Sequence, residues 1–189
     1  MLSAGAGVAV AWATAGSLGV ALEVAYANRT QYDPTDSARA MDRAMKLGFA
    51  LSLGVPLIAQ LLPGWGPSAP LVVVGAAAAI LGLAVRGWAM RVLGRRYTLT
   101  PQAQRASHYL CTAGPYRWVR HPGYLGLLLQ FIGMGMMLSP YAALIGSLPV
   151  VLLTAARLAG EEKLLVSEFG DEYEDYRRRV RWRLLPCLY

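Results

Sequence analysis

Apolar residues in this chain are gathered into long runs with few charges, and this feature constrains the fold more than any other. Five runs have about the length that an α-helix needs to cross a bilayer, roughly 17–25 residues. They cover residues 2–27, 45–62, 70–93, 123–139 and 141–159. Hydrophobic residues make up 56% of the 189 positions, which is too many for a soluble protein of this size. The sequence therefore predicts a single-domain, all-α integral membrane protein with five transmembrane helices.

The charged residues predict how the helices are oriented. The loop at 62–70 has no charge, whereas the segment 91–122 has six arginines and no acid, and the loop 28–44 and the tail after Arg157 are also rich in arginine. These charged segments share one side if the N-terminus is outside, and the positive-inside bias makes that side cytoplasmic. The formal charge of +7 then implies contact with membrane lipids and requires no nucleic acid. The wealth of alanine, glycine and arginine favours a prokaryotic inner or plasma membrane.

One polar stretch lies between two of the apolar runs, at residues 108–126, HYLCTAGPYRWVRHPGYLG. It combines histidines, arginines, tyrosines and prolines, a mixture that a simple connector does not need. Pro122 disfavours helical backbone at His121, so the chain is extended or turned there. Gly123 and Gly126 allow the backbone to approach another group closely. This composition indicates a small-molecule pocket at the mouth of a helix bundle.

The tail contains an apolar stripe at helical spacing. Its members are Leu165, Phe169, Tyr173, Tyr176 and Val180. We therefore expect the fifth span to continue as an amphipathic helix along the cytoplasmic face. The short Ser139-Pro140 link predicts a tight hairpin between the last two spans.

Two adjacent carboxylates, Glu161 and Glu162, lie at the end of the fifth span. Carboxylates at that depth need a positive partner or a cationic ligand. Arg157 lies one turn before Glu161, so an ordinary ion pair within the helix is the simplest alternative. Two further charges, Glu23 and Arg86, are expected to snorkel or to pair with each other near the membrane edge.

The 108–126 stretch and the 157–162 turn end at the same membrane level. Together they offer imidazoles, phenols, a guanidinium and carboxylates. The sequence has no nucleophile elbow, metal-ligand cluster or phosphate-binding loop, and Cys111 and Cys187 lack metal-ligand spacing. A site with both signs of charge and no nucleophile of its own indicates group transfer from a cofactor.

The segments GPYRWVRHPGYLG and EEKLLVSEFGDEYEDYRRRV, in that order, resemble the isoprenylcysteine carboxyl methyltransferase family of integral membrane enzymes. The resemblance runs from about Leu93 to about Pro186, roughly half the chain. It implies that S-adenosylmethionine is the cofactor and that a carboxylate on a lipidated substrate is methylated. It also implies a cytoplasmic pocket, formed by 94–122 and 157–186, that the C-terminal segment closes.

The resemblance also implies roles for single residues. The implied cofactor contacts are Gln102, His108, Leu110, Cys111, Tyr116, His121, Pro122, Gly123, Tyr124 and Glu161. Gln102 matches only if a one-residue gap is allowed. Arg157 is implied to hold the substrate carboxylate. Arg157, Glu161, Glu162 and His121 form the candidate catalytic group.

The methyl acceptor stays open at this stage. A carboxylate needs only an arginine to orient it, whereas an amine or a thiol needs a base, for which His121 or Glu162 is the candidate. The expected substrate is a lipid or a prenylated small molecule that enters from the bilayer. The alternatives are a phospholipid N-methyltransferase, an NADPH-dependent membrane sterol reductase and a membrane scaffold without enzymatic activity.

Overall fold

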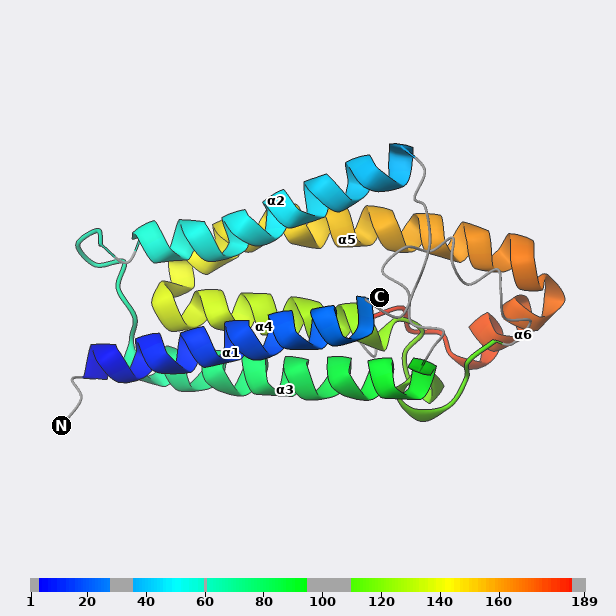
Figure 1. Ribbon diagram of the computed structural model, residues 1–189, viewed down its shortest axis with the longest axis horizontal. Helices are drawn as coiled ribbons and strands as arrows, with labels where there is room; N and C mark the ends of the chain where they lie inside the picture. Colours follow the sequence, from blue (N-terminus) through cyan, green and yellow to red (C-terminus); the bar gives the residue numbers. More distant parts are fainter. Residues whose placement is uncertain (1–3, 28–35, 60, 95–109, 185–189) are drawn as a thin grey trace.

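The computed structural model describes residues 4–27, 36–59, 61–94 and 110–184, and regular structure in these ranges is entirely helical. The elements are α1 (Ala4–Ala27), α2 (Asp36–Ala59), α3 (Ala69–Leu93), the 3-10 turn η3 (Gly114–Arg117), α4 (Pro122–Leu138), α5 (Pro140–Phe169) and α6 (Asp171–Arg179). The five long helices run side by side along the molecule, and α6 lies at one end of the bundle (Figure 1). Each of the five predicted runs therefore corresponds to one long helix, although Leu61 and Leu62, at the end of the second run, lie beyond α2.

Among the described residues, α3 and α5 are long and apolar enough to cross a membrane, and α4 is a shorter apolar helix. Large apolar side chains of α3 and α5 point out of the bundle. Val73 and Ile80 of α3 and Leu144 and Ile145 of α5 are each more than 60% exposed. Such outward apolar faces suit a lipid environment rather than water. The protein is a membrane protein, and the count of five spans stays a prediction.

Helix α4 contacts each of the other four long helices. Its partner on one side is α3, and glycines let the two backbones meet. A Cβ atom placed on Gly82 would lie 2.5 Å from the backbone oxygen of Gly126, and one on Gly133 would lie 2.5 Å from that of Gly75. Small residues permit such close packing between membrane helices. Gln130 of α4 is buried, and its amide donates to the Ala15 oxygen of α1 at 3.3 Å.

Replacing Gly82 with alanine is expected to destabilise the protein by about 1–3 kcal/mol, because the new methyl group meets backbone atoms of α4 that cannot step aside. Gly87, on the same helix, is the matched control: its Cβ would lie 3.9 Å from a Leu22 side-chain carbon. Gly87→Ala should be neutral or slightly stabilising. Thermal unfolding of both variants in detergent measures the difference, and equal stability would contradict the close α3–α4 contact.

The link between α4 and α5 is a single residue, Ser139, in extended conformation. Pro140 follows it and fills the first turn of α5, where a missing N–H costs nothing. The Ser139 amide still donates to Gly135 at 3.0 Å, so the turn is closed by hydrogen bonding. The predicted tight hairpin is confirmed.

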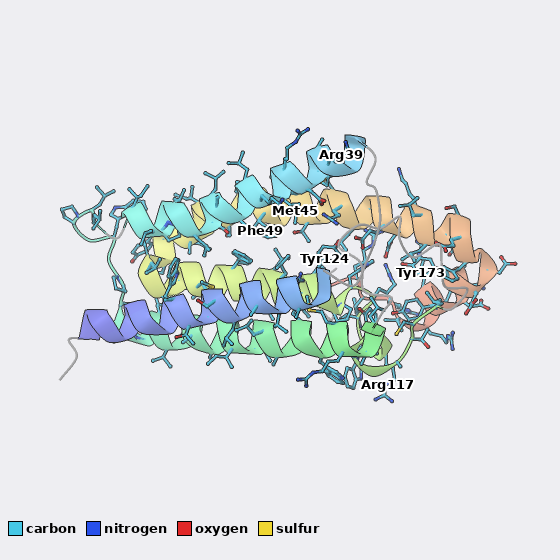
Figure 2. All side chains as sticks on the ribbon, in the orientation of Figure 1. Arg39, Met45, Phe49, Arg117, Tyr124 and Tyr173 are labelled. Atoms are coloured by element: carbon cyan, nitrogen blue, oxygen red, sulfur yellow. The ribbon has the colours of Figure 1, made fainter. Side chains whose placement is uncertain are left out.

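Helix α2 differs from the prediction, because it begins at Asp36 rather than at Met45. Met45 packs in a cluster with Leu127 and Val150. Phe49 stacks on Phe131 of α4, with the two ring centroids 4.5 Å apart. Figure 2 shows Met45 and Phe49 on the inner side of α2 and Arg39 on the outer side. Thus α2 extends past the apolar run, with its inner face still packed on the bundle.

The prediction of one continuous helix from the fifth span into the tail is wrong. Helix α5 runs on to Phe169, but Gly170 adopts φ +50° and ends it. Helix α6 then turns back toward the bundle (Figure 1). The predicted apolar stripe does form one surface, but it is buried: Tyr173, Tyr176 and Val180 pack with Leu110, with Leu165 and Phe169 beside them.

Candidate functional site

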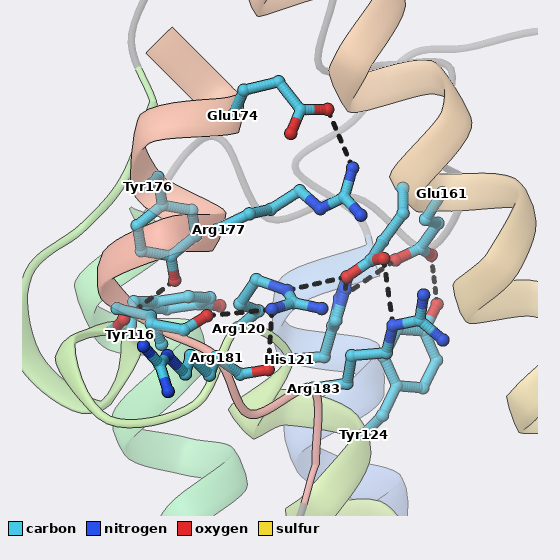
Figure 3. A network of polar contacts seen from close by, with 12 residues as sticks. Tyr116, Arg120, His121, Tyr124, Glu161, Glu174, Tyr176, Arg177, Arg181 and Arg183 are labelled. Carbon is cyan, nitrogen blue, oxygen red and sulfur yellow. Dashed lines mark hydrogen bonds and ion pairs between the residues drawn. The ribbon is translucent and has the colours of Figure 1, made fainter. Parts of the chain in front are cut away.

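Polar side chains gather where the C-terminal half of α5 meets the beginning of α4 and the residues after α6 (Figure 3). Arg157, Glu161 and Glu162 lie on the same helix, α5. His121 and Tyr124 come from the start of α4, where His121 is the N-terminal cap residue with φ −126°. Pro122 follows it directly, so the expectation of non-helical backbone at this histidine is confirmed.

Arg120 is the centre of this network and is 7% exposed. Its Nε donates to Glu162 Oε1 at 2.7 Å, and its Nη1 donates to the carbonyl oxygens of Val180 and Arg181 at 2.8 and 2.9 Å. A buried guanidinium with a carboxylate and two carbonyl partners is well satisfied. Arg120 therefore ties the start of α4 to both α5 and the chain after α6.

The chain after α6 is also held by its backbone. Arg120 N donates to Trp182 O at 2.9 Å, and His121 N donates to Arg183 O at 3.0 Å. The Arg183 side chain reaches Glu162 Oε2 at 3.0 Å, on the opposite oxygen from Arg120. Residues 180–184 are thus pinned across the start of α4, beside the polar cluster.

Glu161 takes part in a second chain of contacts. Its Oε1 accepts a short hydrogen bond from the Tyr124 hydroxyl and lies 3.6 Å from Arg157 Nε. The closer partner of Arg157 is on α2: its Nη1 donates to Asp42 Oδ1 at 2.9 Å. The Arg157 guanidinium also lies over the Tyr124 ring, 6.0 Å from its centroid. The expected Arg157–Glu161 pair exists, but it is not exclusive.

His121 lies between the two glutamates. Its Nδ1 is 3.7 Å from Glu161 Oε2, and its Nε2 is 3.4 Å from Glu162 Oε1. Neither contact has hydrogen-bond geometry, and Nε2 is buried without a hydrogen-bond partner among the described residues. The imidazole is therefore held between the two carboxylates, and its Nε2 makes no hydrogen bond in the described part of the chain.

Two tyrosines of α6 form the remaining part of this region. Tyr176 of α6 donates from its hydroxyl to the Tyr116 oxygen in η3 at 2.8 Å. Tyr173 and Tyr176 are almost fully buried, and their burial raises the pKa of both phenols well above its ordinary value. Both side chains are therefore neutral near pH 7. Their packing joins α6 to Leu110 and η3.

Most of the predicted site residues described here do come together. His121, Tyr124, Glu161, Glu162 and Arg157 form one connected cluster through the contacts above. Leu110 packs on Tyr173, Tyr176 and Val180 instead, and Cys111 is partly buried next to Leu110 in the chain. Gln102 and His108 lie outside the described residues.

The two glycines for which a close approach was predicted have different surroundings. Gly126 does approach another backbone, with its Cβ position 2.6 Å from the Gly82 oxygen. No described atom lies within 4 Å of the corresponding position on Gly123, so that glycine faces open space. Its carbonyl accepts from Arg86 Nη1 at 2.7 Å. Arg86 is thus bonded to the beginning of α4, and the side chain of Glu23 lies outside the described part.

Three residues of the cluster were not predicted from the sequence to belong to the site: Arg120, Arg183 and Asp42. The carboxylate pair did indicate that cationic partners were needed, but not which ones. Asp42 was assigned to a loop, because α2 was expected to begin after it. The spacing of Met41, Met45 and Phe49 was the available signal that the helix starts earlier.

Comparisons with known proteins agree on one family. The sequence model of the isoprenylcysteine carboxyl methyltransferase family matches residues 73–167. Protein-S-isoprenylcysteine O-methyltransferases of Schizosaccharomyces pombe and Homo sapiens are 36% and 34% identical over 102 and 112 residues. These matches cover 53% and 58% of this chain, but only 43% and 39% of the relatives.

A solved structure of a eukaryotic intramembrane Ras methyltransferase is similar in fold. It superposes with a TM-score of 0.55 at 25% identity, covering 79% of this chain and 52% of the other. The common part includes more than the matched sequence segment.

Proposed function

Because the chain belongs to the isoprenylcysteine carboxyl methyltransferase family, we propose that it transfers a methyl group from S-adenosylmethionine to the carboxylate of an isoprenoid or lipid-type substrate. The observation that carries the proposal is the cluster of His121, Tyr124, Arg157 and Glu161, all of which lie inside the family match. Since the chain matches less than half the length of the two curated relatives, its own activity and substrate are to be tested directly.

The residues present fit the cofactor. One oxygen of Glu161 is engaged by Tyr124, while the other lies 3.7 Å from the nearest His121 nitrogen and keeps acceptor capacity. A carboxylate of this kind can accept from an amino group or from ribose hydroxyls. The buried His121 Nε2 has capacity as well. In the proposed site, Tyr116, His121, Pro122, Gly123, Tyr124 and Glu161 line the cofactor pocket with Leu110 and Cys111, and Gln102 and His108 complete it.

S-adenosylmethionine, when bound, supplies a methyl group on a sulfonium that is open to in-line displacement. The protein then has to align the acceptor and exclude water, more than to move protons. A carboxylate acceptor is already ionised near neutral pH. Arg157 is the proposed orienting group, since Asp42 and the Tyr124 ring hold its guanidinium beside Glu161. Glu162 supports the site by fixing Arg120 and Arg183.

Calorimetry on the detergent-purified protein tests the cofactor directly. S-adenosylmethionine and S-adenosylhomocysteine should each bind at a single saturable site, whereas NADPH should not. A folded protein that binds neither S-adenosyl compound would contradict the methyltransferase proposal. Binding of NADPH instead would favour the sterol reductase alternative.

The proposed orientation places the site on the cytoplasmic side and the N-terminus outside. The positions to compare are Ser68, in the uncharged segment before α3, and the exposed Arg117 in η3. In a background without native cysteines, an impermeant maleimide added to intact cells should modify Ser68→Cys and not Arg117→Cys. Modification of only the second variant would invert the orientation.

A further inference from the structure

A second polar feature lies on the far side of Arg120 from the proposed methyl-transfer site. It is a pocket of about 500 Å³ between α6 and the residues that follow it. The lining residues are Arg120, Glu174, Arg177, Arg178, Arg181, Trp182 and Arg183. Figure 3 shows several of these side chains around Arg120. None of Tyr124, Arg157 and Glu161 lines this pocket.

The lining is strongly cationic. It contains five arginines and a single carboxylate, Glu174. Glu162 and Asp175 pair with lining arginines from outside the pocket. The net charge stays positive when they are included, because five guanidiniums then face three carboxylates. Arginines packed this closely repel one another unless an anion lies between them. The pocket is therefore suited to a ligand with at least one negative charge.

The arginines differ in how many hydrogen bonds and ion pairs they form within the protein. Arg120 already binds Glu162 and two backbone carbonyls through Nε and Nη1, and Arg177 pairs with Glu174 at 2.8 Å. Arg178 forms a highly solvent-exposed ion pair with Asp175, with an N–O distance of 3.3 Å. For Arg181, the structure shows no ion pair within the described part of the chain, although its backbone oxygen is bonded to Arg120. A planar guanidinium binds a phosphate through two parallel hydrogen bonds.

The position of the pocket indicates the source of the anion. Arg120 lies two residues before the start of α4, whose 17 residues span about 26 Å. That length approaches the hydrocarbon thickness of a bilayer, roughly 30 Å. A helix of this length puts Arg120 at the level of the lipid headgroups. Trp182 in the lining is also a residue type that concentrates at this level.

We propose that this pocket binds the phosphate of an anionic phospholipid headgroup from the adjacent leaflet. Arg181 and Arg178 bind the phosphate, while Arg120 and Arg183 form the cationic floor. The proposal goes beyond methyl transfer. Arg120 and Arg183 also belong to the polar cluster of the proposed site, but Arg178 and Arg181 do not, and the ligand takes no part in the reaction.

Native mass spectrometry of the full-length protein in detergent tests the proposal, with phosphatidylglycerol and phosphatidylcholine of the same acyl chains as probes. Phosphatidylglycerol should be retained in preference to phosphatidylcholine. Arg181→Gln should weaken phosphatidylglycerol binding about fivefold, as expected for one arginine near a lipid surface. Arg179→Gln is the matched control, because Arg179 is exposed on α6, carries the same charge and does not line the pocket. It should change the affinity less than twofold.

Equal loss in the Arg179 and Arg181 variants would show a diffuse surface attraction and overturn the pocket. Equal retention of the two lipids by the unaltered protein would overturn the anion site altogether. Displacement of phosphatidylglycerol by inorganic phosphate at comparable concentration would assign the pocket to a soluble anion and overturn the lipid source. No S-adenosyl compound is present in any arm, so these results stand apart from the test of the methyltransferase proposal.

Discussion

Arg120→Met is expected to lower the free energy of unfolding by about 3–5 kcal/mol, the usual result of removing one partner from a buried ion pair. The substitution leaves Glu162 buried and also removes two hydrogen bonds to the carbonyls of Val180 and Arg181. Arg183 still lies 3.0 Å from Glu162, which favours the lower end of that range. Reversible unfolding in mixed detergent micelles measures the loss.

The same variant should loosen residues 180–184 locally. Hydrogen exchange should rise at Val180 to Leu184 before the bundle helices are affected, because two of the hydrogen bonds that hold this segment come from the Arg120 side chain. Arg120→Lys should restore only part of the stability, since a point charge cannot serve a carboxylate and two carbonyls together.

Arg178→Met is the matched control, because it also breaks an arginine–carboxylate pair. The Arg178 and Asp175 side chains are 74% and 65% exposed, so this pair should contribute less than about 1 kcal/mol. Similar losses in the two methionine variants would contradict the central role of Arg120.

The helix positions were largely predictable from the sequence, and the exceptions have a physical cause. For α3 and α4 the apolar run and the helix begin within a residue of each other, because a proline in the first turn marks both starts. For α2 the two boundaries separate. The helix continues beyond the apolar run as an amphipathic helix, with Met41 inward and Arg43 exposed. Hydropathy reports where lipid is expected and does not report where hydrogen bonding along the helix ends.

The candidate site was predictable in its motifs but not in its partners. His121 and the paired glutamates stand out locally, because their chemistry is unusual beside apolar runs. Their contacts join residues far apart in the sequence: Arg120 meets Glu162 across 42 positions, and Arg157 meets Asp42 across 115. Such pairs depend on how α2, α4 and α5 pack together, and no single segment contains that information.

The turn at Gly170 was hidden for a different reason. The apolar stripe from Leu165 to Val180 keeps helical spacing across the glycine, so periodicity alone predicts one helix. A glycine, which adopts positive φ without strain, is nevertheless a common stop signal after a helix. The stripe stays on one side because α6 folds back onto the same cluster.

Arg157 and Glu161 are expected to behave differently when each is replaced, although they lie one helical turn apart. Glu161→Ala should weaken S-adenosylhomocysteine binding by roughly 10- to 150-fold, equivalent to about 1.5–3 kcal/mol for a charged hydrogen-bond acceptor in a partly buried site. Arg157→Ala should leave that affinity nearly unchanged and depress turnover instead, because the substrate carboxylate loses its orienting group.

The structure makes this separation possible. When Glu161 is removed, Arg157 keeps its closer partner Asp42, and when Arg157 is removed, Glu161 keeps the Tyr124 hydroxyl. Neither residue is therefore left unpaired by loss of the other, and a shared collapse of the site is not expected. Asp42→Asn serves as the intermediate variant. It should weaken the contact that positions the Arg157 guanidinium, and it should therefore lower turnover, but by less than Arg157→Ala does. The affinity for S-adenosylhomocysteine should stay near that of the unaltered protein.

Calorimetry with S-adenosylhomocysteine measures the affinities, and a methylation assay on a farnesylated thioether carboxylate measures turnover. Arg157→Lys should recover little activity, because an ammonium group does not reproduce the two-pronged grip of a guanidinium on a carboxylate. Equal loss of S-adenosylhomocysteine affinity in the two alanine variants would reduce Arg157 and Glu161 to a structural ion pair. Loss of turnover that lysine fully restores would require only a positive charge at position 157, and would contradict a bidentate role for Arg157.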